Sequence, residues 1–287
     1  MIILETGIGL LQKTILIRKE KGLFLTGGFG ILLALLCLVF MLVHGNNVPP
    51  YGDWIKPITF NFALGAFLIT TFFMMPLAKF SVTEQKRFSW MLIITVLYAY
   101  MVEVIQTYRG VDPRFGQGDF LTNKLPGILF GVISLTIVGL YVVILIKFLA
   151  KKPMQERPLL VLGIRYGFIA TMLGFSSGIW MIILSSRITG SGGNVMTIHF
   201  LGFHGLQAIP LIAWFLERSR LDYSRSIRIV HTAAWLWLSA IGCMFVQTYQ
   251  GYSITAITPA MIVCSLLLIV WFCILVHSFL LYVRRKD

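Results

Sequence analysis

Charged residues, and acidic residues above all, are scarce in this chain. Only 12% of its 287 residues are charged, and 11 Asp and Glu stand against 24 Lys and Arg. Hydrophobic residues make up 57% of the chain, and the mean hydropathy is +0.85. A water-soluble domain of this length could not keep so much apolar surface away from water. The composition therefore argues against a soluble protein and indicates one that crosses a membrane several times.

Patterns that mark soluble enzymes are also missing. The four cysteines lie in apolar runs and lack the Cys-x-x-Cys spacing of zinc sites, which indicates small buried residues: Cys37, Cys243, Cys264 and Cys273. The sequence shows no Walker loop, nucleophile elbow or His-Glu-x-x-His pattern. These absences argue against an ATP-driven protein or a serine hydrolase, and whether the protein is an enzyme stays open.

Long apolar runs make up most of the sequence. About 20 apolar residues make a helix long enough to cross a hydrocarbon core, whereas the strands of a membrane barrel would alternate polar and apolar residues. We therefore predict an all-α polytopic membrane protein with eight transmembrane helices, near residues 23–44, 57–78, 88–108, 125–148, 164–185, 195–216, 229–250 and 257–282.

The basic residues predict the orientation of these helices. If the N-terminus is on the inner side, 19 of the 24 Lys and Arg fall in inner segments, and the remaining five are Lys56, Arg109, Arg114, Lys124 and Arg187. The positive-inside rule then places both termini in the cytoplasm. The net charge of +13 is explained by this topology and by attraction to lipid headgroups, so we expect no nucleic-acid partner.

One polar motif occurs twice, each time at the end of an apolar run. Gln-Thr-Tyr-x-Gly stands at 106–110 and again, 141 residues later, at 247–251. The same offset places Arg87 on Arg228, the basic residues that open the third and seventh helices. This recurrence indicates that the chain consists of two related halves.

Beyond the motif the offset falls to 133, which matches Pro126 with Pro259 and indicates an insertion of eight residues around 112–115. A unit of four helices crosses the membrane an even number of times, so its copy starts on the same side and the repeats are parallel. We predict an N-terminal interfacial segment at 1–22, a first repeat at 23–150, a cytoplasmic linker at 151–163 and a second repeat at 164–287.

Polar side chains inside apolar runs are the candidates for function, because they are expensive in a bilayer. Glu103 is the only acidic residue within such a run away from its ends. It is either a proton-carrying carboxylate that faces a polar cavity, or half of an ion pair with Lys56 or Arg109 that locks two helices. Gln106 lies on the same helix face, and Gln247 is its counterpart in the second repeat.

The five histidines fall at two depths. His44, His199 and His204 lie toward the outer side, and His231 and His277 toward the inner side, as two stacked b-type haems would require. His199 and His204 are five residues apart, about 140° around a helix, so a regular helix does not direct both at one ion. Headgroup contacts and hydrogen bonds between helices are the alternative for these histidines. Gln207 shares a helix face with His204.

Two resemblances follow from these motifs. The segments 54–57, 106–110 with Arg114-Phe115, and 199–207 are similar to a family of uncharacterised bacterial multi-spanning proteins, which implies the bacterial inner membrane but no activity. The chain also resembles haem A synthase, in which paired outer histidines ligate haem. The features that carry this resemblance are the four-plus-four helices, the segment 187–192, the outer histidines and the motif Gln-x-x-x-Gly at the ends of the third and seventh helices.

The resemblance to haem A synthase is incomplete. Lys56 and Asn61 stand near the start of the second helix, Pro259 and Met261 near the start of the eighth, and the His-Arg ligand motif of that family is absent. The resemblance therefore implies one haem, between His199 or His204 and a neighbour such as His44 or Met261.

Our leading hypothesis is an integral inner-membrane protein that binds a haem-like or quinone-like redox ligand in an outer-facing polar pocket between its halves. In this mechanism a histidine ligates iron or hydrogen-bonds a carbonyl of the ligand, the glutamines orient the ligand, and Glu103 carries the proton. The predicted ligand-binding residues are His44, Gln106, His199, His204, Gln207 and Gln247, with His199 and His204 as metal ligands. The alternatives are a small-solute or proton-coupled transporter, with Glu103 and Lys56 in the pathway, and an accessory subunit with membrane-protein partners.

Overall fold

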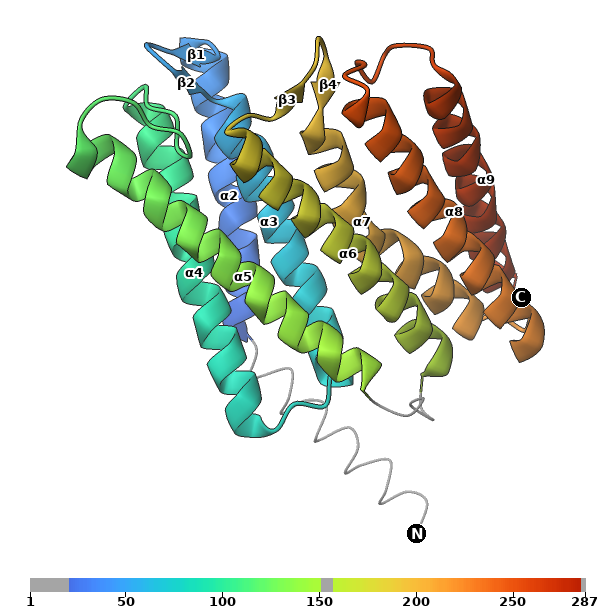
Figure 1. Cartoon of the computed structure of the whole chain (residues 1–287). Helices are drawn as coiled ribbons and strands as arrows, with labels where there is room; N and C mark the ends of the chain where they lie inside the picture. Colours follow the sequence, from blue (N-terminus) through green and yellow to red (C-terminus); the bar gives the residue numbers. More distant parts are fainter. Residues whose placement is uncertain (1–20, 151–156, 285–287) are drawn as a thin grey trace. The chain divides into compact units, whose positions relative to one another are not determined.

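The computed structural model describes residues 21–150 and 157–284. In these ranges eight helices are long and apolar enough to span a membrane. They are α2 (Lys21–His44), α3 (Ile55–Met74), α4 (Val82–Tyr108), α5 (Leu125–Leu149), α6 (Pro158–Leu184), α7 (Val195–Glu217), α8 (Tyr223–Tyr249) and α9 (Pro259–Val283) (Figure 1). The short helix η1 (Met75–Leu77) continues α3, and η2 (Phe120–Lys124) leads into α5. The predicted all-α class with eight candidate membrane helices is confirmed.

The start of α6 differs from the prediction. The helix begins at Pro158, inside the predicted linker 151–163, because proline at the first position of a helix has a suitable φ and needs no amide donor. Residues 1–20, which make up most of the predicted interfacial segment, and residues 151–156 of the linker lie outside the described ranges.

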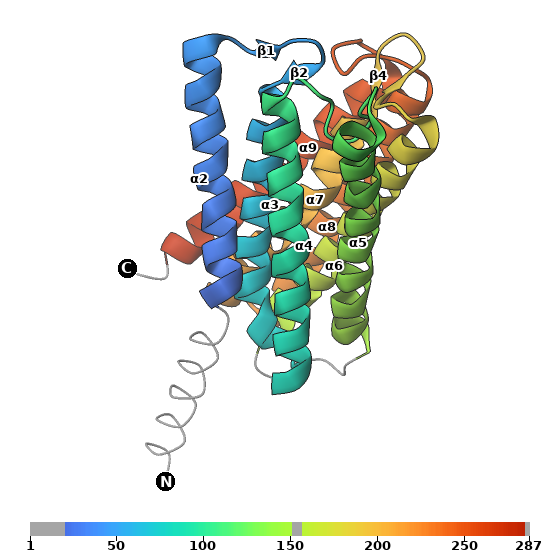
Figure 2. The ribbon, with the colours of Figure 1, turned by 90° about the vertical axis from the view of Figure 1, so that its left-hand side faces the viewer.

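The chain divides into two compact units between Lys147 and Phe148, and each is described here by itself. In the first unit, α2 packs against α3, and both contact α4 (Figure 2). A Cβ atom added at Gly27 of α2 would lie 2.8 Å from the backbone oxygen of Gly65 on α3, so the two backbones touch where the side chains are missing. Helix α5 joins this unit through a hydrogen bond between Tyr141 and Thr71, 2.5 Å between their oxygens.

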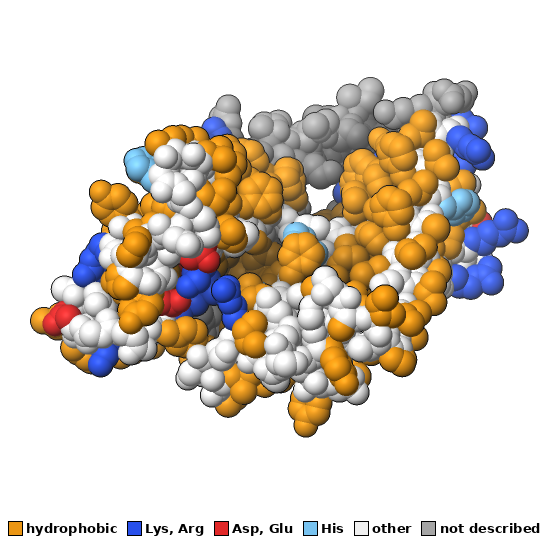
Figure 3. All heavy atoms as spheres, turned by 90° about the horizontal axis from the view of Figure 1, so that it is seen from above, with side chains coloured by type: hydrophobic (Ala, Val, Ile, Leu, Met, Phe, Trp, Pro, Cys, Tyr) orange, Lys and Arg blue, Asp and Glu red, His pale blue; other side chains and the backbone are white. Residues whose placement is uncertain are grey.

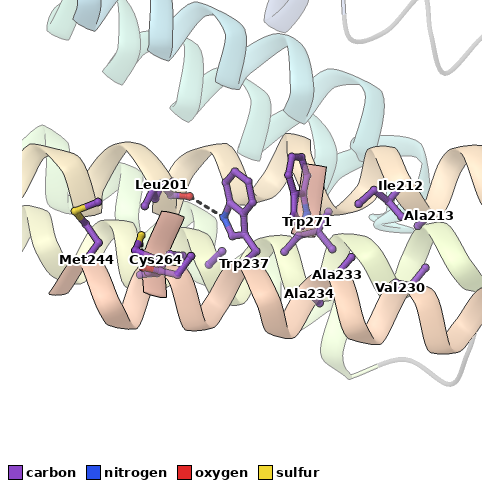
Figure 4. Close-up of a cluster of buried hydrophobic side chains, with 14 of the residues drawn as sticks. Leu201, Ile212, Ala213, Val230, Ala233, Ala234, Trp237, Met244, Cys264 and Trp271 are labelled. Carbon is purple, nitrogen blue, oxygen red and sulfur yellow. Dashed lines mark hydrogen bonds between the residues drawn. The ribbon is translucent and has the colours of Figure 1, made fainter. Parts of the chain in front are cut away.

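In the second unit, α6 and α7 pack through glycine-rich faces, and α8 and α9 close an apolar core. Trp237 of α8 and Trp271 of α9 meet edge to face with ring centroids 4.7 Å apart. The indole N–H of Trp237 donates to the carbonyl oxygen of Leu201 on α7 at 3.0 Å, as Figure 4 shows. This bond satisfies the one polar atom that the tryptophan buries.

Each unit also carries a small antiparallel hairpin. Strands β1 (Asn47–Val48) and β2 (Gly52–Asp53) precede α3, and β3 (Ile188–Thr189) and β4 (Gly193–Asn194) precede α7. Every strand residue of the second hairpin follows its counterpart by 141 positions.

The helices that follow the hairpins show the same offset. Helices α4 and α8 are both 27 residues long, and their N-cap residues Ser81 and Asp222 are 141 positions apart. After each helix a glycine takes a left-handed φ, +71° at Gly110 and +79° at Gly251, a conformation that other residues rarely adopt. The offset between the two sequence motifs thus also relates hairpins, caps and helix ends.

Close packing of α6 on α7 gives a direct test of this fold. A Cβ atom at Gly202 would lie 2.5 Å from the backbone nitrogen of Gly174 and 2.9 Å from the carbonyl oxygen of Ala170, so backbone must move. Gly202→Ala should lower the free energy of unfolding by about 1–3 kcal/mol, measured by unfolding in detergent. Gly242→Ala, where nothing lies within 4 Å of the added atom, is the matched control and should be close to neutral. Equal stability of the two variants would contradict the packing.

Candidate functional site

A buried carboxylate marks the strongest candidate site. The side chain of Glu103, on α4, is fully buried, and its Oε1 accepts two hydrogen bonds from Arg114: from Nε at 2.9 Å and from Nη2 at 2.6 Å. Its other oxygen, Oε2, is buried without a hydrogen-bond partner among the described residues. Because buried polar atoms are almost always hydrogen-bonded, this oxygen is the atom of the site with unused bonding capacity.

The loop between α4 and η2 positions Arg114. The Oδ1 atom of Asp112 accepts from the backbone N–H groups of Arg114 and Phe115, both at 2.9 Å, which closes the chain into a tight turn. The guanidinium carbon of Arg114 lies 5.4 Å from the ring centroid of Phe60 and 5.7 Å from that of Phe130. The arginine is therefore held by its carboxylate partner, by two rings and by its own backbone turn.

Lys56 of α3 completes the charged cluster. Its Nζ donates to Oδ2 of Asp112 at 2.7 Å. The cluster thus holds two positive and two negative groups, and Figure 3 shows acidic and basic side chains gathered at this end of the first unit. Burial raises the pKa of Asp112, but the Lys56 ammonium and the two N–H donors outweigh it, so this pKa lies below its ordinary value. The ionised Asp112 carboxylate therefore stabilises the folded state at neutral pH, and this stabilisation is lost as the pH falls below about 4.

The sequence-based choice of partner for Glu103 was wrong. Lys56 pairs with Asp112 instead, and Arg109 donates to Oε1 of Gln106 at 2.7 Å and to the carbonyl oxygen of Thr122 at 2.7 Å. The actual partner, Arg114, comes from the inserted segment around 112–115. The change of repeat offset had located this insertion, but spacing along α4 could not show that the loop folds back over the helix.

Three more buried polar side chains without hydrogen-bond partners in the described ranges accompany Glu103. They are Asn61 on α3 and Tyr100 and Thr107 on α4, none of them more than 1% exposed. Tyr100, Glu103 and Thr107 follow at spacings of three and four, so they share one face of α4. A Cβ atom at Gly30 of α2 would overlap the Tyr100 hydroxyl and lie 3.0 Å from the backbone oxygen of Asn61. The Tyr100 hydroxyl is thus covered by α2.

The two repeated glutamines have similar roles. The side-chain amide of Gln106 donates to the carbonyl oxygen of Thr122 at 2.9 Å, and that of Gln247 donates to the carbonyl oxygen of Ser253 at 2.7 Å. Gln247 also accepts a hydrogen bond from the Thr258 hydroxyl. Both glutamines therefore tie the end of a helix to the loop that follows it, which gives a physical reason for the recurrence of the motif.

The histidines are distributed over both units. His44 belongs to the first unit, where it is exposed and its ring stacks on Phe40 with centroids 5.7 Å apart. His199 and His204 lie on α7 in the second unit. The Nδ1–H group of His199 donates to the carbonyl oxygen of Gly174 at 2.9 Å, which assigns the proton to Nδ1. His204 lies three residues before Gln207 on the same helix, so the two residues are one turn apart.

Across residues 21–150 and 157–284, no group of three or more His, Cys, Asp and Glu side chains is arranged to hold a metal ion. A haem needs only one or two axial ligands, and the hydrogen bond from His199 to a backbone carbonyl is the orientation typical of a ligating histidine. The ring of His199 also packs edge to face against Phe203, with centroids 4.6 Å apart.

No protein-family model, curated protein or solved structure matches this chain. The function is therefore inferred from the geometry of the residues themselves.

A double-mutant cycle tests the Glu103–Arg114 pair. Arg114→Ala should lower the free energy of unfolding by about 2 kcal/mol, less than a fully buried pair because the arginine is 30% exposed. In the Glu103→Gln background the same substitution should have a smaller effect, since no buried carboxylate then loses its partner. Unfolding of the four proteins in detergent measures the coupling. Additive effects would show that the two side chains do not interact.

Proposed function

We propose that the protein is a proton-coupled transporter of a small anionic solute in the bacterial inner membrane, with Glu103 as the group that exchanges the proton. One observation carries this proposal: a fully buried carboxylate in a candidate membrane helix has one oxygen bound by arginine and the other without a partner among the described residues. Ionisable groups at such positions are costly, and they commonly mark ion or proton pathways.

The charges of the cluster suggest how proton and solute are coupled. With Glu103 ionised, the positive charges of Arg114 and Lys56 are balanced by Glu103 and Asp112. A proton on Glu103 removes one negative charge and weakens its hold on Arg114. The cluster then has a net positive charge, which an anion can neutralise by binding the guanidinium group. Proton and anion would therefore bind together.

The two units differ at this site. The offset of 141 places Met244, a buried apolar residue, where the first unit has Glu103. The insertion that supplies Asp112 and Arg114 also has no counterpart in the second half of the sequence. We infer that two parallel repeats arose by duplication and that only the first acquired the charged site. The shared offset of hairpins, caps and helix ends supports the duplication.

The orientation is part of the same proposal. Cytoplasmic termini are supported by the distribution of Lys and Arg, 19 against five, and they place the Glu103 cluster toward the outer side. An anion and a proton would then enter from outside the cell.

Proton uptake into proteoliposomes tests the proposal. Inward gradients of chloride, phosphate and malate are imposed one at a time, and the internal pH is followed with a trapped dye. Acidification with at least one anion is expected, and Glu103→Gln should abolish it because glutamine carries no exchangeable carboxyl proton. Glu84→Gln, which alters the exposed pair with Lys147, is the control and should retain uptake. Uptake that survives in Glu103→Gln, or that is equally fast in empty liposomes, would contradict the role of Glu103.

A redox ligand in the second unit is the second candidate, favoured by the orientation of His199. Its bond to Gly174 leaves Nε2 as the nitrogen that bears the lone pair, as iron ligation or a hydrogen bond from a ligand requires.

An oxidised-minus-reduced visible spectrum of the purified protein tests this candidate. A haem signal that is lost in His199→Ala or His204→Ala and kept in His44→Ala, whose ring is exposed in the first unit, would support it. A haem signal unchanged in both α7 variants would contradict these ligands.

A further inference from the structure

A groove between α8 and α9 lies at the end of the second unit opposite its hairpin. The first turns of α8 and the last turns of α9 form its walls, consistent with the antiparallel packing of the two helices. Its lining residues are Arg225, Arg228, Ile229, Thr232, Val270, Cys273, Ile274 and His277.

The arginines of this groove form no salt bridge among the described residues. Arg225 and Arg228 are exposed and one turn apart on α8, and neither takes part in an ion pair within the described ranges. Asp222, the nearest carboxylate along the chain, caps α8 by accepting from the backbone N–H of Ser224 at 2.9 Å. Glu217 is bound to Arg157 at 2.7 Å. Asp222 also attracts Arg225, three residues further along the chain, but forms no salt bridge with it, whereas Glu217 is held by Arg157.

The corresponding turn in the first unit is neutralised by the protein itself. The offset of 141 relates Arg228 to Arg87 and Arg225 to Glu84. Glu84 pairs with Lys147 of α5 at 2.7 Å, so in the first unit a carboxylate links the two helices. The second unit has an arginine in place of that carboxylate. Its groove therefore presents positive charge where the first unit carries an ion pair.

The apolar part of the groove determines which anion fits. Beyond the arginines the walls continue along the helices with Ile229, Val270, Cys273 and Ile274, and α9 is apolar enough to lie in the hydrocarbon region. A soluble anion would use only the arginines. An amphiphile with a negative headgroup would use both parts, since its phosphate meets the guanidinium groups and an acyl chain follows the apolar wall.

We propose that this groove is a binding site for an anionic phospholipid. Arg225 and Arg228 bind the phosphate, His277 lies at the headgroup level, and Val270, Cys273 and Ile274 contact the acyl chain. The site is independent of Glu103 and of any transport.

Native mass spectrometry of the full-length protein in a neutral detergent tests this site. Phosphatidylglycerol and phosphatidylcholine are titrated separately. The protein should retain phosphatidylglycerol preferentially, and the double variant Arg225→Ala/Arg228→Ala should weaken its binding on the order of tenfold. Arg225→Lys/Arg228→Lys keeps the charge and should retain most of the binding. Lys86→Ala/Arg87→Ala, which removes two charges from the related helix of the first unit, is the matched control and should have little effect.

A second variant separates a lipid site from a phosphate site. Cys273→Phe fills the apolar part of the groove without changing charge, so it should weaken phosphatidylglycerol binding. Inorganic phosphate at the same concentration should not displace the lipid. Equal binding of the two lipids, equal losses in the α8 variant and its control, or displacement by phosphate would overturn the proposal.

Discussion

Inside a hydrocarbon core every polar group needs a partner that the protein itself supplies, and the rest of this structure follows from that constraint. Helices satisfy their own backbone, and many hydroxyl groups donate back to the preceding turn, as Ser134 does to the carbonyl oxygen of Phe130 at 2.8 Å and Ser265 to that of Met261 at 2.9 Å. Trp237 finds a carbonyl on a neighbouring helix. Several buried polar atoms of the described residues lack such a partner, and Oε2 of Glu103 is the carboxylate oxygen among them.

The two units pair their polar groups through the same local structures. A hairpin precedes the second helix of each unit, a capped helix of 27 residues ends in a tyrosine, and a glycine with positive φ turns the chain into the next loop. Gln106 and Gln247 then hold those loops by bonding backbone carbonyl groups. The hairpins, helix caps and glycine turns are thus common to both units, and the units differ at other positions.

Charge is where the units diverge. The described part of the first unit forms three salt bridges, Glu103 with Arg114, Asp112 with Lys56 and Glu84 with Lys147. The second unit has Met244 in place of Glu103 and Arg225 in place of Glu84, so it lacks the buried acid and has a groove lined by two arginines. These differences underlie the two proposals, proton exchange in the first unit and binding of an anionic lipid in the second.

The sequence by itself determined the helical class, the eight apolar segments, the 141-residue offset and the prominence of Glu103, because length, hydropathy and spacing are local properties. Only the tertiary structure decided which cation pairs with Glu103, that α2 covers the Tyr100 hydroxyl and which of the described arginines form salt bridges. Arg114 lies 11 residues from Glu103 on a loop, and Lys147 lies 63 residues from Glu84 on another helix. Such pairs depend on how loops and helices come together in space, and neither periodicity nor composition contains that information.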